Sequence, residues 1–343
     1  MNRFTACFLL LCAPVVLSAD TVIRMKGGER EELKGTVVDE SIKEVSIKIG
    51  GDDGKIEKIA GDSVVSVERD SLPKALMDAK ESADAAGSAE ECKAAASLLD
   101  KVIQSSSKEW HKEYAARFKV SMFLANNMLD EAVKALDEMN TLAKQSRYIY
   151  DLTNNACRLG VIVGNGAVVK KLVGSLKGQG GTLSAALAAY YEGEMSRTSN
   201  PTEAESKYRL AFNQMKNNDS PQGRELWLDA SCRYGQQMVI AKKLDAAREQ
   251  AKLIEERLPK LDDRGKGAYY CLMGDILRSE AKDPDALYAY MRVVVQHPTD
   301  RDLQAHSMDW ALFLSEKLQY KDTAVMLTAE MSRRFPSYRR QAK

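Results

Sequence analysis

The sequence predicts a mostly α-helical protein with a small β-rich module near its N-terminus. Three observations support this fold class. Residues 20–72 contain runs that alternate apolar and polar side chains, which is typical of half-buried strands. From Pro73 to the end, Ala, Leu, Met, Lys and Glu dominate, and these residues favour helices. Within this second part small residues and prolines recur at fixed distances, which indicates repeated helical pairs.

The first residues, MNRFTACFLLLCAPVVLSA, have the organisation of a secretory signal peptide. Arg3 precedes an apolar run from Phe8 to Leu17, and small residues follow up to Ala19. The run is shorter than the roughly 20 apolar residues that span a bilayer, so no membrane span is expected. We expect residues 1–19 to be removed near Ala19 and the protein to be exported to the periplasm or cell envelope. A buried apolar segment and lipidation at Cys12 are the alternatives.

Composition excludes several classes of protein. Of 343 residues, 29% are charged and 44% are hydrophobic, which is ordinary for a soluble folded chain. The formal net charge is +1, and loss of Arg3 with the signal peptide brings it to zero. Nucleic-acid binding requires clustered positive charge, so no nucleic-acid partner is expected. The basic tail, residues 332–343, is interpreted as a solvated helix end.

Residues 20–72 are expected to form a small closed β-barrel. Val45, Ile47 and Ile49 alternate with polar residues, and the run GGDDG at 50–54 supplies a turn between strands. About five short strands fit this length, and closure would remove exposed sheet edges. The stretch loosely resembles SH3-like or Sm-like N-terminal modules of exported bacterial proteins. An Sm-like RNA site is the alternative, and export together with mixed charges disfavours it.

A fixed spacing recurs in the helical part. In the clearest unit Gly274 is followed by Ala286, Tyr290 and Pro298. The preceding unit has Gly235, Ala247, Ala251 and Pro259 at the same separations, and the last has Ala324 and Pro336. This pattern resembles the tetratricopeptide repeat, a helix–turn–helix unit of about 34 residues. Small residues allow two helices to cross closely, and proline cannot continue a helix.

The same small position can be followed along residues 73–343. It falls on Cys92, Ala132, Ala167, Ala204, Ala247, Ala286 and Ala324. We therefore expect a tetratricopeptide-like α-solenoid of about seven helical hairpins. An irregular α-solenoid or a bundle of another type is the alternative. The resemblance implies a right-handed superhelix in which the first helix of each pair lines the concave side.

No group of residues indicates catalysis or metal binding. The three histidines, His111, His297 and His306, have no second histidine or cysteine at a ligand spacing. Nucleophile-elbow, zinc-protease and phosphate-loop motifs are absent from the sequence. We therefore expect a protein that is not an enzyme, with no catalytic residues, no cofactor and no metal.

Four cysteines remain after the signal peptide: Cys92, Cys157, Cys232 and Cys271. Cys232 and Cys271 occupy equivalent positions in successive units. Neighbouring helices lie about 8–10 Å apart, which exceeds the Cα separation of a disulfide. All four are expected to be free and largely buried thiols.

The repeat alignment also indicates which residues face the concave side. The candidate partner-binding residues are Gln236, Val239, Asp275, Arg278, His306, Asp309, Phe313 and Glu316. The resulting hypothesis is an exported, non-catalytic adaptor that binds a protein or peptide segment in its groove. The alternatives are a structural component of the cell envelope, whose β module contacts wall or membrane partners, and an enzyme of an unfamiliar type. Homo-oligomerisation is left open.

Overall fold

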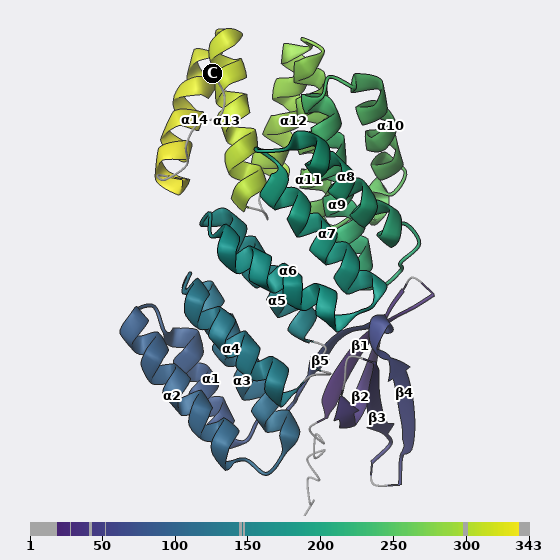
Figure 1. Cartoon of the computed structure of the whole chain (residues 1–343), viewed down its shortest axis with the longest axis vertical. Coiled ribbons are helices and arrows are strands. Elements are labelled where there is room, and N and C mark those ends of the chain that lie inside the picture. The colour runs from purple at the N-terminus through teal and green to yellow at the C-terminus, as the bar shows by residue number, and fades with distance from the viewer. Residues whose placement is uncertain are drawn as a thin grey trace, which may run out of the picture. The chain divides into compact units, whose positions relative to one another are not determined.

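The structure, a computed structural model of the 343-residue chain, describes residues 19–27, 29–40, 43–51, 53–143, 146, 148–297 and 301–335. Within these residues it contains fourteen α-helices and a five-stranded antiparallel sheet (Figure 1). A mostly helical fold with a small β-rich module is therefore confirmed. The expected signal peptide, residues 1–19, lies outside the described residues except for Ala19.

The chain divides into two compact units. The first combines the chain up to Met122 with Glu138–Tyr148, and the second combines Phe123–Asp137 with the chain from Ile149 onward. The sheet and the first two helices thus belong to one unit.

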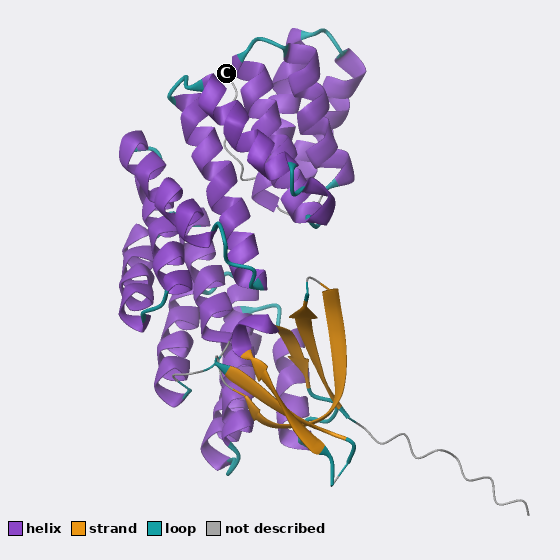
Figure 2. Cartoon of the chain, turned by 90° about the vertical axis from the view of Figure 1, so that its right-hand side faces the viewer, coloured by secondary structure: helices purple, strands orange, loops and turns teal. Residues whose placement is uncertain are grey.

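Five strands form the sheet: β1 (Asp20–Lys26), β2 (Glu29–Glu40), β3 (Glu44–Ile49), β4 (Lys55–Ala60) and β5 (Val64–Glu68). Their order is β4-β3-β2-β1-β5, and every neighbouring pair is antiparallel. The expected closed barrel is wrong, because β4 and β5 are the outer strands of an open sheet in the described part of the chain (Figure 2). β5 has only five residues and pairs with β1. Side chains make a further link: Arg24 on β1 donates to Glu31 on β2 at 2.7 Å and to Glu57 on β4 at 2.5 Å.

The long strand β2 allows the sheet to bend. At Gly35 a Cβ atom would collide with the carbonyl oxygen of Lys48 on β3, so only glycine permits this close approach. The register with β3 shifts between Val37 and Asp39, and such an irregularity increases local twist. The bent sheet encloses an apolar core formed by Val22, Val37, Val45, Ile47, Ile59, Val64 and Val67.

A buried polar cluster joins the sheet to helices of the same unit. Arg69 follows β5, and its guanidinium pairs with Asp20 at 3.2 Å and with Glu40 at 3.1 Å. It also lies over the ring of Trp110, 4.7 Å from the centroid. The Tyr148 hydroxyl donates to Glu40 at 2.7 Å. The two terminal nitrogens of Arg69 are thus paired with carboxylates, as a buried charge requires, whereas its Nε atom is buried without a hydrogen-bond partner among the described residues.

The helices follow one another with short connections. They are α1 (Lys74–Ala85), α2 (Ala89–Ser105), α3 (Glu109–Ala125), α4 (Leu129–Leu142), α5 (Tyr148–Ile162), α6 (Gly166–Gln179), α7 (Thr182–Ser196), α8 (Pro201–Met215), α9 (Pro221–Ile240), α10 (Leu244–Glu255), α11 (Asp263–Ser279), α12 (Asp283–Gln296), α13 (Arg301–Lys317) and α14 (Lys321–Arg334). In the second unit α7, α9, α11 and α13 contact one another in succession, and each packs against the even-numbered helix that follows it.

The same turn connects five odd-numbered helices to their even-numbered partners. The residue before the N-cap has a positive φ at Asn127, Gly164, Lys242, Ala281 and Gln319. In each turn the next amide donates to a carbonyl five residues earlier, as in Lys282 N to Leu277 O at 2.9 Å. This is the bonding of a Schellman motif, which satisfies the last carbonyls of a helix. Recurrence of one turn shows that the connections are structural repeats.

The predicted small positions are the fourth residues of the even-numbered helices. Cys92, Ala132, Ala204, Ala247 and Ala286 are each completely buried. Ala324 is half-buried. The assignment in α6 is wrong: Ala167 is exposed, and Val169 takes the buried fourth position because the helix begins after the N-cap Asn165.

The glycines of the repeat lie at close helix contacts. A Cβ at Gly274 would lie 2.6 Å from the ring of Tyr290 on α12, and one at Gly193 on α7 would lie 2.7 Å from the ring of Tyr208 on α8. Gly235 differs, because its nearest neighbour is Leu272 on α11. The position of Tyr290 is occupied in α10 by Ala251, which is too small to reach Gly235.

The one expected helix-ending proline among the described residues does not itself end a helix, because α10 stops at Glu255. Pro259 lies in a short 3₁₀ turn, Leu258–Lys260, after α10. Pro298 and Pro336 lie outside the described residues. As for membrane insertion, every helix in the described part of the chain is too short or too polar to cross a bilayer.

Candidate functional site

A polar hollow of about 100 Å³ lies on the odd-numbered helices of the second unit. Every lining residue comes from α5, α7, α9, α11 or the start of α13. They are Asn154, Asn155, Arg158, Val161, Ile162, Tyr190, Tyr191, Glu194, Glu225, Asp229, Cys232, Arg233, Gln236, Arg264, Ala268 and Leu303. α7, α9, α11 and α13 contact one another in succession, and Tyr191 on α7 bonds to Asn154 on α5, so the faces of these helices together form the surface.

Charges of both signs alternate within the hollow. Arg264 donates to both carboxylate oxygens of Asp229, at 2.8 and 2.7 Å, and to Glu225 at 3.1 Å. One terminal nitrogen of Arg264 is shared between the two oxygens of Asp229 and the other donates to Glu225, so the guanidinium bridges two carboxylates of α9. Arg158 contributes a further positive charge from α5.

Amide and hydroxyl groups supply neutral polar contacts beside these charges. The Tyr191 hydroxyl donates to the side-chain oxygen of Asn154 at 2.6 Å and also lies 2.9 Å from the backbone carbonyl oxygen of Asn154. That hydrogen bond fixes the oxygen of the amide and leaves its NH₂ group as a donor. Asn155 is exposed on the same helix.

A continuous polar network extends from the hollow toward the C-terminal helices. Glu194 on α7 pairs with Arg233 on α9 at 2.8 Å and accepts a hydrogen bond from the Tyr208 hydroxyl at 2.8 Å. Arg233 then donates to the Gln236 side chain at 3.0 Å, and Gln236 donates to Asp275 on α11 at 2.9 Å. Buried charges separated along the helices are thus linked through neutral amides and hydroxyls.

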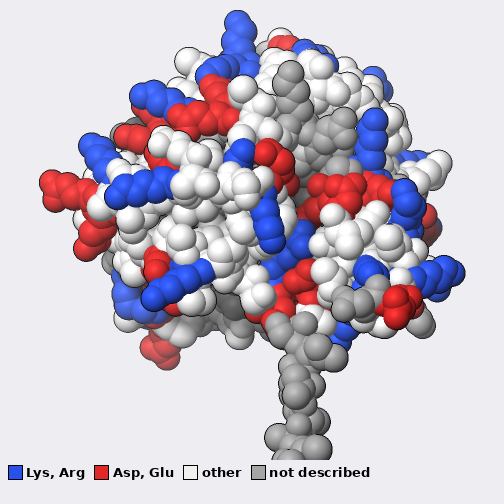
Figure 3. Space-filling view, turned by 90° about the horizontal axis from the view of Figure 1, so that it is seen from below, with Lys and Arg blue, Asp and Glu red and all other residues white. Residues whose placement is uncertain are grey.

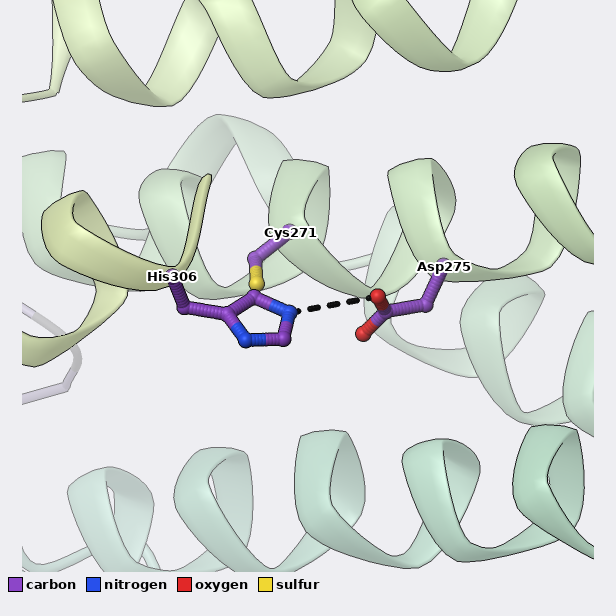
Figure 4. Close-up of side chains that lie close together, drawn as sticks. All are labelled: Cys271, Asp275 and His306. Atoms are coloured by element: carbon purple, nitrogen blue, oxygen red, sulfur yellow. Dashed lines mark hydrogen bonds and ion pairs between the residues drawn. The ribbon is translucent and has the colours of Figure 1, made fainter. Parts of the chain in front are cut away.

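Asp275 is the centre of the last part of this network. Its side chain is 8% exposed and accepts hydrogen bonds from the Tyr290 hydroxyl at 2.6 Å and from His306 at 3.3 Å (Figure 4). The Cys271 sulfur points toward the imidazole ring. Arg278 lies 4.0 Å from the carboxylate, and its guanidinium stacks on Trp310, 3.8 Å from the ring centroid.

The neighbours of Asp275 determine which groups are charged. Burial alone would raise the pKa of Asp275, but His306, the Tyr290 hydroxyl and Arg278 hold it below its usual range. Burial alone would lower the pKa of His306, but Cys271 and Asp275 raise it to about 10. At neutral pH the two residues therefore form an imidazolium–carboxylate pair. Glu194 is similarly buried, and Arg233 and Arg197 lower its pKa.

The structure brings together four of the eight predicted site residues. Gln236, Asp275, Arg278 and His306 belong to the network, and Gln236 also lines the hollow. The other four lie elsewhere. Val239 and Asp309 are buried, at 7% and 0% exposure, Phe313 packs against Trp310, and Glu316 is exposed.

Of the residues that line the hollow, sequence reasoning predicted only Gln236 as a site residue. Asn154, Arg158 and Glu194 lie on α5 and α7, where the repeat pattern is degenerate. One signal was available, because Gly193, Ala204 and Tyr208 have nearly the spacing of Gly274, Ala286 and Tyr290. Another was the interval between Cys271 and Asp275, which places both side chains on one face of a helix.

The four cysteines are free, and their expected burial is confirmed. Burial also raises the pKa of the Cys157 thiol to about 12, which keeps it protonated and unreactive.

Lys and Arg side chains are interspersed with Asp and Glu on the face shown in Figure 3. Among the described residues drawn on that face, the two signs of charge are mixed.

Comparison of the chain with models of known protein families found no match, and comparison with curated proteins found none either.

Proposed function

We propose that the protein is an exported, non-catalytic adaptor whose tetratricopeptide-like helical array binds an extended protein segment in the hollow on its odd-numbered helices. One observation carries the proposal: all residues that line the hollow come from odd-numbered helices, which are the first helices of the pairs. In the family that the repeat resembles, these helices line the concave side.

The chemistry of the hollow favours a peptide over a small apolar ligand. Three arginines and three carboxylates line it, together with Asn154, Asn155 and two tyrosines. Side-chain amides can pair with the N–H and C=O groups of an extended backbone. Charges of both signs favour a segment that itself carries mixed charges, because unmatched charges would be repelled.

Site-directed photocrosslinking in the native compartment tests the location of binding. A photoreactive residue at Asn155 lies in the hollow, one at Lys34 lies on the exposed face of β2, and one at Arg209 lies on the exposed surface of α8. An adaptor should crosslink a single segment of a partner at position 155 and not at 209. Crosslinking only at position 34, to wall or membrane components, would instead support a structural role in the envelope.

A synthetic peptide covering the crosslinked segment then gives an affinity. Asn154→Ala should weaken its binding about 5- to 10-fold, since one hydrogen bond contributes about 1 kcal/mol. Arg209→Ala, on the exposed surface of the even-numbered helix α8, should leave the affinity unchanged. Equal affinities in all three proteins, measured by calorimetry, would exclude the hollow as the binding site.

A further inference from the structure

Three potential metal ligands of different chemistry meet between α11 and α13. Cys271 and Asp275 are four residues apart on α11, and His306 comes from α13. One ligand atom from each lies within 4.8 Å of the others. We propose that Cys271, Asp275 and His306 form a site for a zinc ion, separate from the hollow but linked to it through Gln236.

The ligand set suits zinc better than other common ions. Calcium and magnesium prefer sites made of oxygen atoms, whereas zinc accepts sulfur, nitrogen and carboxylate oxygen together. Tetrahedral zinc requires ligand atoms about 3.3–3.8 Å apart, given bond lengths of about 2.0–2.3 Å. His306 Nε2 and Asp275 Oδ1 already lie 3.3 Å apart. The Cys271 sulfur lies within 4.8 Å of both atoms, and rotation about the Cα–Cβ bond of Cys271 changes its distance from them.

Neighbouring side chains hold the carboxylate in place. The Tyr290 hydroxyl donates to one oxygen of Asp275 at 2.6 Å, and the Gln236 amide donates to the other at 2.9 Å. Outer partners of this kind fix the orientation of a metal ligand and raise affinity. The His306 side chain is 25% exposed, which gives a path for the ion from solvent. Three protein ligands leave a fourth position for water.

Charge balances when zinc binds. The Cys271 thiol and the His306 imidazolium each release a proton to water, and the two positive charges of the ion replace them. Arg278 therefore remains beside a site whose net charge is unchanged.

Cobalt(II) is the appropriate probe, because a thiolate ligand produces a charge-transfer band in the near ultraviolet. The mature full-length chain should bind one cobalt ion with this band, and equimolar zinc should remove it. Cys271→Ser should abolish the band, and His306→Gln should weaken binding more than 10-fold. Tyr290→Phe should keep the band and weaken binding about 10- to 100-fold, the usual effect of losing an outer partner.

Cys232→Ser is the matched control. Cys232 occupies the equivalent position on α9, but Gln236 follows it where α11 has Asp275. This variant should bind cobalt like the parent. A missing band, or a band that persists in Cys271→Ser, would overturn the proposal. Binding that is the same in every variant would show an adventitious surface ion only and would also overturn it. Circular dichroism of each variant separates loss of the site from loss of the fold.

Discussion

Gly274 illustrates how a single missing side chain determines helix packing. A Cβ atom there would lie 2.6–2.8 Å from three carbons of the Tyr290 ring, and this ring is itself fully buried. Neither group can move without disturbing the hydrogen bond from Tyr290 to Asp275. Packing of a glycine against this aromatic ring therefore also positions the polar network.

Gly274→Ala is expected to lower the free energy of unfolding by about 1–3 kcal/mol, the range for overpacking a core. Gly174→Ala is the control, because Gly174 is inside α6 and a Cβ there would meet nothing within 4 Å. Alanine at that exposed helical position should stabilise the protein by about 0.5–1 kcal/mol. Urea unfolding of the two variants measures both effects, and equal effects would show that the Tyr290 contact does not constrain position 274.

The residue scale also shows what the sequence can and cannot predict. Burial of Ala247 and Ala286 could be predicted, because each is a small residue at a fixed distance from a glycine. Ala167 was misplaced because no clear glycine spacing identifies the N-cap of α6. The link from Gln236 to Asp275 depends on how far α9 and α11 are rotated about their axes, and a local pattern does not encode that rotation.

At the scale of elements, the recurring turn places a residue with positive φ before five of the seven even-numbered helices, namely α4, α6, α10, α12 and α14. Of the five residues with positive φ in these turns, only Gly164 is a glycine. Ala281, with a φ of 58°, has no side-chain group that could favour this conformation. This left-handed backbone conformation costs a residue with a Cβ atom roughly 1–2 kcal/mol. The turn is therefore specified by its hydrogen bonds and by packing of the helices rather than by the preference of each residue.

Ala281→Gly is expected to raise the free energy of unfolding by up to about 1 kcal/mol, because relief of strain exceeds the added flexibility of the unfolded chain. Gly164→Ala is the reciprocal change in the α5–α6 turn, where a Cβ meets nothing within 4 Å, and it should destabilise by about 1 kcal/mol. Thermal and urea denaturation measure both values. Destabilisation by Ala281→Gly would show that its backbone is not strained.

The open sheet was not predictable from its strands alone. Alternation predicted five strands correctly, but closure depends on whether β4 and β5 are long and close enough to pair. β5 has only five residues and pairs with β1, and β4 pairs with β3, so β4 and β5 are the edges of the sheet in the described residues. Contacts between β4 and the start of the sheet, such as the Arg24–Glu57 ion pair, join residues 33 positions apart, and periodicity carries no information about them.

At the scale of the whole molecule, the two compact units need not share one unfolding transition. Their buried carboxylates also respond differently to pH. In the second unit the pKa of Glu194 is lowered, so Glu194 stabilises the fold above its unfolded pKa of about 4.3. In the first unit burial raises the pKa of Glu113, and its Oε1 atom has no hydrogen-bond partner.

The sign of the Glu113 effect follows from this raised pKa. The folded state binds the proton of Glu113 more tightly than the unfolded state does, so its contribution stabilises the fold below the unfolded pKa of about 4.3. That stability is lost as the pH rises through the folded pKa, which leaves a buried carboxylate at neutral pH. Glu113→Gln removes the charge and is expected to raise the stability of the first unit at pH 7.5 by up to about 1 kcal/mol.

Tryptophan fluorescence can assign this effect to one unit. Trp110 lies in the first unit, whereas Trp227 and Trp310 lie in the second, so replacing the latter two with Phe leaves a single reporter. In that background Glu113→Gln should increase the urea midpoint at pH 7.5, and the increase should diminish as the pH falls toward 4. Glu109→Gln, an exposed position on the same helix, should change little. A Glu113→Gln protein that is less stable at pH 7.5 would mean that the carboxylate is held by its charged neighbours, Arg69 and Arg117, more strongly than burial opposes it.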